Sequence, residues 1–158
     1  MIRITREADY GIVLMACLAQ AEGQPRSAAA LARQRRLPLP MVSKILKSLA
    51  RAGLLSSQRG AQGGYSLAWP AAKISAADII GALEGPIAIT ECSDETHDGC
   101  SRQDHCEVSG HWSRINQAIY TALQSISLEE MSRPDQPRPV RFHSPHRVTT
   151  VNAAGHPV

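Results

Sequence analysis

The segment from Pro40 to Gly53 carries two opposite stripes of side chains at helical spacing, and this pattern constrains the fold more than any other feature. Proline suits the first position of a helix because no N–H donor is needed there, and glycine suits the residue just past the end. A helix with an apolar face and a polar face packs the first on a core and turns the second outward. The apolar stripe consists of Val42, Ile45, Leu46 and Leu49, and the opposite stripe of Ser43, Lys44, Lys47 and Arg51.

Two helical patterns precede this segment, and two strand patterns follow it. Helices are expected from residue 6 to about residue 21 and from residue 28 to about residue 35, each after a residue with a capping hydroxyl group. Residues 54–58 and 65–68 have the composition of short strands, and the loop between them, residues 59–64, is rich in glycine. Three helices followed by a β-hairpin predict a winged helix-turn-helix.

The second half of the chain predicts two further helices on either side of a polar, cysteine-bearing loop. Ser75 and Asp78 have the spacing of a capping box, which opens a short helix that Gly85 ends. A longer helix is expected from residue 110 to about residue 125. Its apolar stripe is widened toward a second face by Ala118 and Ala122, which suits contact with a second copy of the chain. The stripe consists of Trp112, Ile115, Ile119, Leu123 and Ile126.

The expected fold is therefore mainly α with a small β-hairpin wing, in which a winged helix-turn-helix is followed by a long dimerisation helix. We expect a DNA-binding domain at residues 1–73, a cysteine loop and dimerisation helix at 74–131, and a disordered, proline-rich tail at 132–158. The longest apolar run covers only residues 12–19, which is too short to span a membrane. A cytoplasmic homodimer without a membrane partner is the expectation.

The charges are unevenly distributed, although the net charge is only +3. Residues 23–73 contain nine basic side chains and no carboxylate, whereas carboxylates dominate residues 74–135. This asymmetry favours a polyanionic partner, here double-stranded DNA, over the alternative of a merely solvated surface. An enzyme is not expected, because the glycines at 60, 63 and 64 lack the Lys-Ser/Thr of a P-loop and no nucleophile elbow is present.

The basic half predicts two kinds of DNA contact. Short polar or cationic side chains on the outer face of a recognition helix reach base edges, and arginines around it position the protein on phosphates. The predicted base contacts are Ser43, Lys44 and Lys47, with Pro40 and Met41 placed to touch a thymine methyl group. The predicted phosphate contacts are Arg33, Arg35, Arg36 and Arg51. Arg59, beside Gly60 at the tip of the wing, is placed to enter the adjacent minor groove.

Cys92, Cys100 and Cys106 lie in the polar loop rather than on an apolar helix face. Clustered thiols in a reducing compartment indicate a bound group, and three thiolates with one further ligand suit an iron–sulfur cluster or tetrahedral zinc. The spacing alone does not choose between these groups, and a thiol redox switch is a further alternative. Cys17 falls among apolar residues of the first helix, which predicts an inert core thiol.

A set of short motifs is spread over residues 1–131: Ile4-Thr5, Asp9-Tyr10-Gly11, the run from Leu54 to Gly60, Gly63-Gly64-Tyr65, Thr90-Glu91-Cys92, Cys100, Cys106, Trp112 and Ile126-Ser127-Leu128. In these motifs the chain resembles the IscR, NsrR and RirA group of winged-helix regulators, and most closely the members associated with the SUF iron–sulfur assembly system. The resemblance implies that the three cysteines hold a [2Fe–2S] or [4Fe–4S] cluster, that the long helix forms an antiparallel dimer, and that the state of the cluster controls promoter binding.

The chain departs from the IscR-like pattern at one position, because Ser109 replaces the histidine expected three residues after the last cysteine. NsrR-like members use a carboxylate near the start of the first helix of the partner subunit, and Asp9 matches it here. Glu7, His105 and His111 are rivals for this fourth ligand. The resulting hypothesis is a cluster-dependent repressor of iron–sulfur assembly (SUF/ISC) genes. The alternatives are a nitric-oxide or redox sensor that uses the same cluster, and a zinc-stabilised DNA-binding module.

Overall fold

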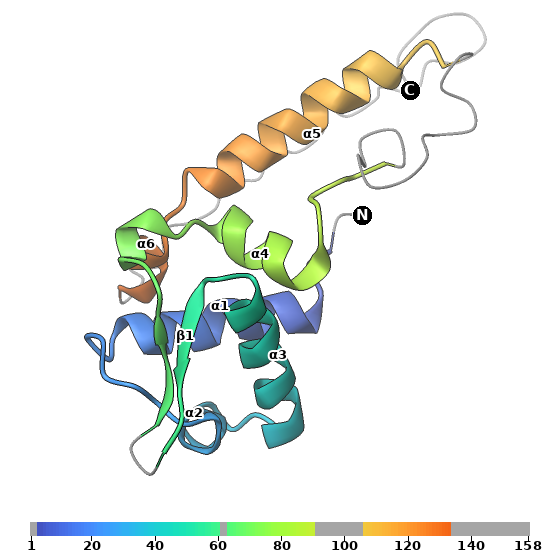
Figure 1. The fold of residues 1–158 in the computed structure, drawn as a ribbon. Coiled ribbons are helices and arrows are strands. Elements are labelled where there is room, and N and C mark those ends of the chain that lie inside the picture. The colour runs from blue at the N-terminus through green and yellow to red at the C-terminus, as the bar shows by residue number, and fades with distance from the viewer. Residues whose placement is uncertain (1–2, 61–62, 91–105, 134–158) are drawn as a thin grey trace, which may run out of the picture.

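The computed structural model describes residues 3–60, 63–90 and 106–133, and the predicted tail and most of the cysteine loop lie outside these ranges. The fold is mainly helical with one two-stranded antiparallel hairpin, as predicted (Figure 1). Its elements are α1 (Arg6–Ala19), α2 (Ala28–Arg35), α3 (Leu39–Arg51), β1 (Leu55–Gln58), β2 (Gly64–Leu67), the 3-10 helix η1 (Ala71–Lys73), α4 (Ala76–Glu84), α5 (Ser109–Gln124) and α6 (Leu128–Ser132).

Helix α1 is the centre of the core, and α3, α4 and α6 pack around it. Gly11 of α1 allows close packing, because a Cβ atom at this position would collide with the Leu83 side chain of α4. Leu128 of α6 is fully buried in the same core. The core therefore contains side chains from both sides of residue 73, while the division of the chain into domains at that residue stays a prediction. Its largest fully buried members include Leu14, Met15, Leu18, Leu31, Ile45, Leu46, Leu49, Ile74, Ile79 and Leu128.

Gly53 explains why helix α3 ends at Arg51. This glycine has φ of +77°, a left-handed conformation that costs other residues more. The N–H groups of Gly53 and Leu54 donate to the carbonyl oxygens of Ala50 (3.1 Å) and Leu49 (3.0 Å), which satisfies the last turn of the helix. The chain is thereby turned directly from the recognition helix into the wing.

The wing pairs Leu55 with Leu67 and Gln58 with Gly64 at its two ends. It is also fixed to the chain that enters α2, because Arg26 and Tyr65 exchange two backbone hydrogen bonds of 2.9 Å. Gly64 makes this close approach possible, since a Cβ atom there would lie 2.6 Å from the backbone of Arg26. The hairpin therefore has a fixed position beside α2 and α3.

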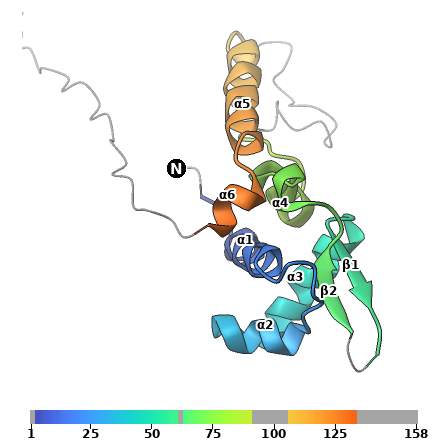
Figure 2. The ribbon, with the colours of Figure 1, turned by 90° about the vertical axis from the view of Figure 1, so that its left-hand side faces the viewer.

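Helix α5 projects from the body, and Figures 1 and 2 both place its start at the end remote from α1. It contacts α4, and Ile119 and Leu123 in its C-terminal half line a hollow together with Ile80 of α4. Asn116 holds the preceding segment, because its side chain donates to the Ile87 carbonyl (2.9 Å) and accepts from the Ile89 N–H (3.2 Å). Much of the N-terminal half of α5 is exposed.

The structure differs from the sequence-based expectation in three places. Helix α1 ends at Ala19 rather than near Ala21, because Glu22 and Gly23 already have positive φ values. The short elements η1 and α6 were not predicted. Among the described residues, none of the helices has both the length and the apolar character that a membrane crossing needs.

Candidate nucleic-acid interface and cysteine site

The two stripes of α3 lie where the sequence predicts them. Val42, Ile45, Leu46 and Leu49 are fully buried, which turns the opposite stripe outward. Lys44, Lys47 and Arg51 are exposed, and Ser43 is half-buried. At the start of the helix, Pro40 is exposed, whereas Met41 is half-buried and packs against the core. Helix α3 thus presents a basic face to solvent and packs its apolar face on the core.

The arginines of α2 flank this face. Arg33, Arg35 and Arg36 are all exposed. Arg36 caps the helix with φ of +53°, a left-handed conformation that is unfavourable for a residue with a Cβ atom. Its N–H donates to the carbonyl of Arg33 at 3.3 Å, and the N–H of Leu37 donates to Ala32 at 3.0 Å. The turn between α2 and α3 therefore places an arginine where glycine or asparagine is usual.

Arg35 has a partner in the protein that the sequence does not indicate. Its Nε atom donates to the Sγ atom of Cys17 in α1. Cys17 is only 5% exposed, in agreement with its predicted place in the core. The hydrogen bond fixes the stem of Arg35 at the end of α2.

Arg59 and Gly60 are exposed in the turn of the wing, next to residues 61–62, which lie outside the described part. The wing and α2 are joined by the Arg26–Tyr65 pairing. The exposed basic residues of α2, α3 and the wing therefore belong to elements that pack against one another.

The first turn of α1 contacts both the recognition helix and the end of α4. Glu7 forms an ion pair with Lys44, with 2.6 Å between Oε1 and Nζ. Two residues earlier, the N–H and the hydroxyl group of Thr5 both donate to Oε1 of Glu84, at 3.0 and 2.8 Å. The Glu7–Lys44 pair is separated by 37 positions in the sequence and the Thr5–Glu84 pair by 79. No local sequence pattern indicates either contact.

Only some of the predicted cluster ligands lie within the described residues. Cys92, Cys100 and His105 lie outside the described residues, and Cys106 is half-buried just before α5. Asp9 and His111 are exposed, and Asp9 lies on the first turns of α1, far from the start of α5 (Figures 1 and 2). Within the described ranges, no group of three or more metal-ligating side chains comes together.

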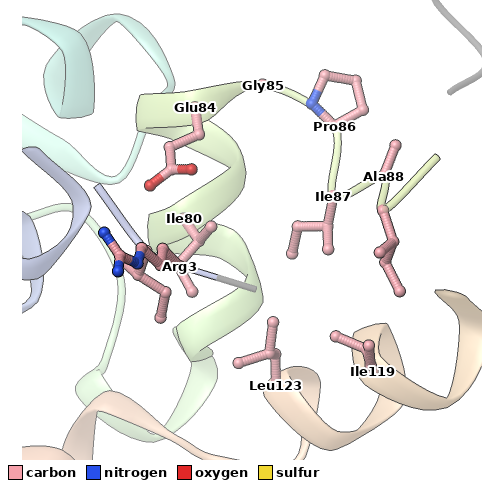
Figure 3. A pocket seen from close by; sticks show the side chains of 11 residues that line it. Arg3, Ile80, Glu84, Gly85, Pro86, Ile87, Ala88, Ile119 and Leu123 are labelled. Atoms are coloured by element: carbon pink, nitrogen blue, oxygen red, sulfur yellow. The ribbon is translucent and has the colours of Figure 1, made fainter. Parts of the chain in front are cut away.

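Two large apolar side chains of the predicted stripe are exposed on α5. Trp112 is 37% exposed and Ile115 44%, whereas Ile119 and Leu123 of the same predicted stripe are half-buried. These two residues line a hollow of about 550 Å³ between α4, α5 and the chain at 86–89. Figure 3 shows Ile80, Ile87, Ile119 and Leu123 around this hollow, with Arg3 and Glu84 at one side. The apolar stripe therefore divides into a part that faces its own chain and a part that faces solvent.

Comparison with known proteins identifies the family. The sequence profile of Rrf2, described as an iron-dependent transcriptional regulator, matches residues 4–134. The chain belongs to the Rrf2 family. This Rrf2 protein is 30% identical over 131 residues to the HTH-type transcriptional regulator IscR of Xenorhabdus nematophila, a match that covers 82% of the chain and 79% of that regulator.

Two solved structures share the fold of this Rrf2 protein. CymR, the global cysteine regulator of B. subtilis, has a TM-score of 0.65 at 34% identity, with 84% of this chain and 97% of CymR covered. IscR of T. potens has a TM-score of 0.62 at 31% identity, with 82% and 85% covered. The protein is therefore a winged-helix regulator of transcription, and its family is one of DNA-binding proteins rather than enzymes.

Proposed function

We propose that this Rrf2 protein is an iron–sulfur-cluster-dependent repressor that binds promoter DNA as a cytoplasmic homodimer. The observation that carries the proposal is the position of Cys106 at the start of α5, which projects away from the body of its own chain (Figure 1). A group held there with Cys92 and Cys100 would lie beside the helix through which two copies meet. The state of this bound group would then affect how the DNA-binding elements of the two subunits are placed relative to each other.

The donor set suits an iron–sulfur cluster. Cys106 is accessible enough to bind a metal, and thiolates are the ordinary ligands of such clusters. Asp9 is an exposed carboxylate in the first turn of α1. Because the start of α5 lies far from α1 of the same chain, an Asp9 ligand would come from the partner subunit. When bound, the cluster would supply a centre that responds to oxidants, nitric oxide or iron supply.

The exposed half of α5 supports the homodimer. Trp112 and Ile115 are large apolar side chains that water covers in a single chain, and burial of such a stripe against a second copy would stabilise a dimer. The hollow beside Ile119 and Leu123 would also be covered in that arrangement. A two-fold dimer would present two α3 helices to consecutive major grooves on one face of the duplex.

The regulated genes are proposed to be those of iron–sulfur assembly. This part of the proposal is supported by the sequence relationship to IscR and by the cysteine motif of the chain. Ser43, Lys44 and Lys47 would read bases, Pro40 and Met41 would contact a thymine methyl group, and Arg59 would enter the minor groove.

The relationship to CymR favours a second candidate function. CymR, a global cysteine regulator, is as similar in fold to this protein as IscR is. A cluster-free regulator that responds through thiols or binds zinc at Cys92, Cys100 and Cys106 is therefore the alternative.

The test is an absorption spectrum of the full chain purified without oxygen, together with counts of iron, acid-labile sulfide and zinc. Brown protein with iron and sulfide supports the proposal. Zinc or bare thiols without sulfide in fresh anaerobic protein would contradict it. DNA-binding titrations of the cluster-loaded and cluster-free forms then show which of them occupies the promoter.

A further inference from the structure

We propose that Glu7 of α1 determines the sequence preference of DNA binding by positioning Lys44 of the recognition helix. The inference rests on the proposed function only in its DNA-binding part, and it does not depend on the cluster. Glu7 does not contact the DNA in this proposal. It acts through the lysine.

The geometry joins the two side chains directly. Oε1 of Glu7 lies 2.6 Å from Nζ of Lys44, and the side chains are 37% and 66% exposed. The ammonium group has three N–H donors, and the ion pair uses one of them. Lys44 therefore keeps donors for base acceptors, while its Nζ atom is held near the N-terminal end of α1.

The restraint matters because lysine is a flexible point charge. A lysine on a recognition helix that is free to move can reach phosphate oxygens as well as base edges, and phosphate contacts carry no sequence information. Within residues 23–73 no carboxylate is available to hold it. Glu7, from outside this basic region, supplies that restraint and reduces the affinity of Lys44 for phosphate.

The position of Glu7 is itself fixed. Thr5 caps α1 by accepting the N–H of Ala8 at 3.2 Å, and it donates twice to Oε1 of Glu84 at the end of α4. Ala8 is fully buried, so the turn that carries Glu7 is held on one side by the core and on the other by α4. A carboxylate on such a fixed turn can orient its partner.

The experiment compares wild-type protein, Glu7→Gln, Lys44→Ala and the double variant. The probes are the duplex that wild-type protein enriches from a random-sequence library and a scrambled duplex of the same composition. Dissociation constants are measured for both probes at several salt concentrations. Glu22→Gln is the matched control, because it removes one exposed carboxylate of the same type from the turn after α1.

Glu7→Gln is expected to bind scrambled DNA more tightly and to lower the ratio of specific to nonspecific affinity about three- to fivefold. The salt dependence for scrambled DNA should steepen by about one unit of slope, since Lys44 then neutralises a phosphate. In the Lys44→Ala background, Glu7→Gln should leave the ratio unchanged. The control should behave like wild type.

An unchanged ratio in Glu7→Gln would overturn the inference, as would a change that persists without Lys44. A loss of cluster absorption in Glu7→Gln would make Glu7 a ligand and overturn it as well. If wild-type protein enriches no duplex, the proposed DNA-binding function fails, and the inference fails with it. Lys44→Gln breaks the same pair from the other side and should abolish the effect of Glu7→Gln if the side chains act together.

Discussion

Nε of Arg35 donates a hydrogen bond to Sγ of Cys17, which joins the last turn of α2 to the buried face of α1. Cys17 is 5% exposed and surrounded by core residues. Its thiol therefore has a structural partner and no access to a ligand in solvent. Cys106 differs from Cys17, because it is half-buried and lies just before α5.

The first prediction separates these thiols. Replacing Cys92, Cys100 or Cys106 by Ala should remove the visible absorption of anaerobically purified protein, because a cluster that loses one thiolate ligand becomes unstable. Cys17→Ala should keep both colour and sulfide content, at a cost of about 1 kcal/mol in the free energy of unfolding. Absorption spectra with iron and sulfide counts measure this. A colourless Cys17→Ala protein that is still folded would contradict the assignment.

The second prediction concerns the fourth ligand. Asp9→Ala should make the cluster labile or change its spectrum, because an exposed carboxylate on α1 is removed. The same change also removes a favourable interaction with the helix dipole, at about 0.3–1 kcal/mol, so the melting temperature must be followed in parallel. Glu22→Ala is the control. An untouched spectrum in Asp9→Ala, together with bleaching in His105→Ala or His111→Ala, would transfer the ligand role to a histidine.

Local patterns in the sequence were sufficient to predict most of the helices and the wing. Val42, Ile45, Leu46 and Leu49 identify the buried face of α3, and the Ser75–Asp78 capping box identifies the start of α4. The start of α6 has the same signal, because Ser127 and Glu130 form a second capping box. A helix of five residues is too short for apolar periodicity, and for this reason α6 was not predicted.

Long-range pairings could not be predicted from the sequence. Glu7 and Lys44 are separated by 37 residues, and only the packing of α1 on α3 brings them together. Similarly, the stripe on α5 gives no sign that Leu123 faces its own chain while Ile115 faces solvent. Leu123 lies beside α4 and the chain at residues 86–89, and no local pattern on α5 indicates that these segments pack there. The residues of the predicted DNA interface and the cluster ligands stay predictions until they are tested.

The third prediction uses the left-handed turn at Arg36. Arg36→Gly should raise the free energy of unfolding by up to about 1 kcal/mol, because glycine adopts positive φ without a Cβ clash. It should also weaken binding to all DNA and flatten the salt dependence by about one unit of slope. Denaturant titration and DNA titration measure the two effects. Arg33→Gly is the control, since it lies inside α2 and should lower stability.

The fourth prediction concerns the dimer. Ile115→Glu should convert the protein to a monomer, because Ile115 is exposed in the single chain and the proposed dimer would bury the new charge without a partner. Ala29→Glu, at an exposed position of α2, introduces the same charge and should leave the dimer intact. Sedimentation at several protein concentrations distinguishes the two states. A dimer that persists in Ile115→Glu would place the interface elsewhere.

The fifth prediction separates base reading from phosphate contact on the basic surface. Ser43→Ala and Arg59→Ala should relax sequence preference, at about 1–3 kcal/mol for each good base contact, whereas Arg51→Ala should weaken specific and nonspecific binding by the same factor. The physical reason is position, because Ser43 lies toward the N-terminal half of α3 and Arg51 is its last residue. The two positions differ in distance from the helix end that enters the groove first.

The measurement is binding of each single variant to the enriched duplex and to scrambled DNA over a range of salt concentrations. Arg51→Ala should lower the salt slope by about one, because one phosphate contact is lost, and Ser43→Ala should leave the slope unchanged, because serine carries no charge. Arg114→Ala on α5 is the control for a lost cation outside the basic half and should change neither quantity. If Ser43→Ala and Arg59→Ala instead lower both affinities equally, neither side chain reads sequence. The preference would then have to come from Lys44 and Lys47 or from the shape of the DNA.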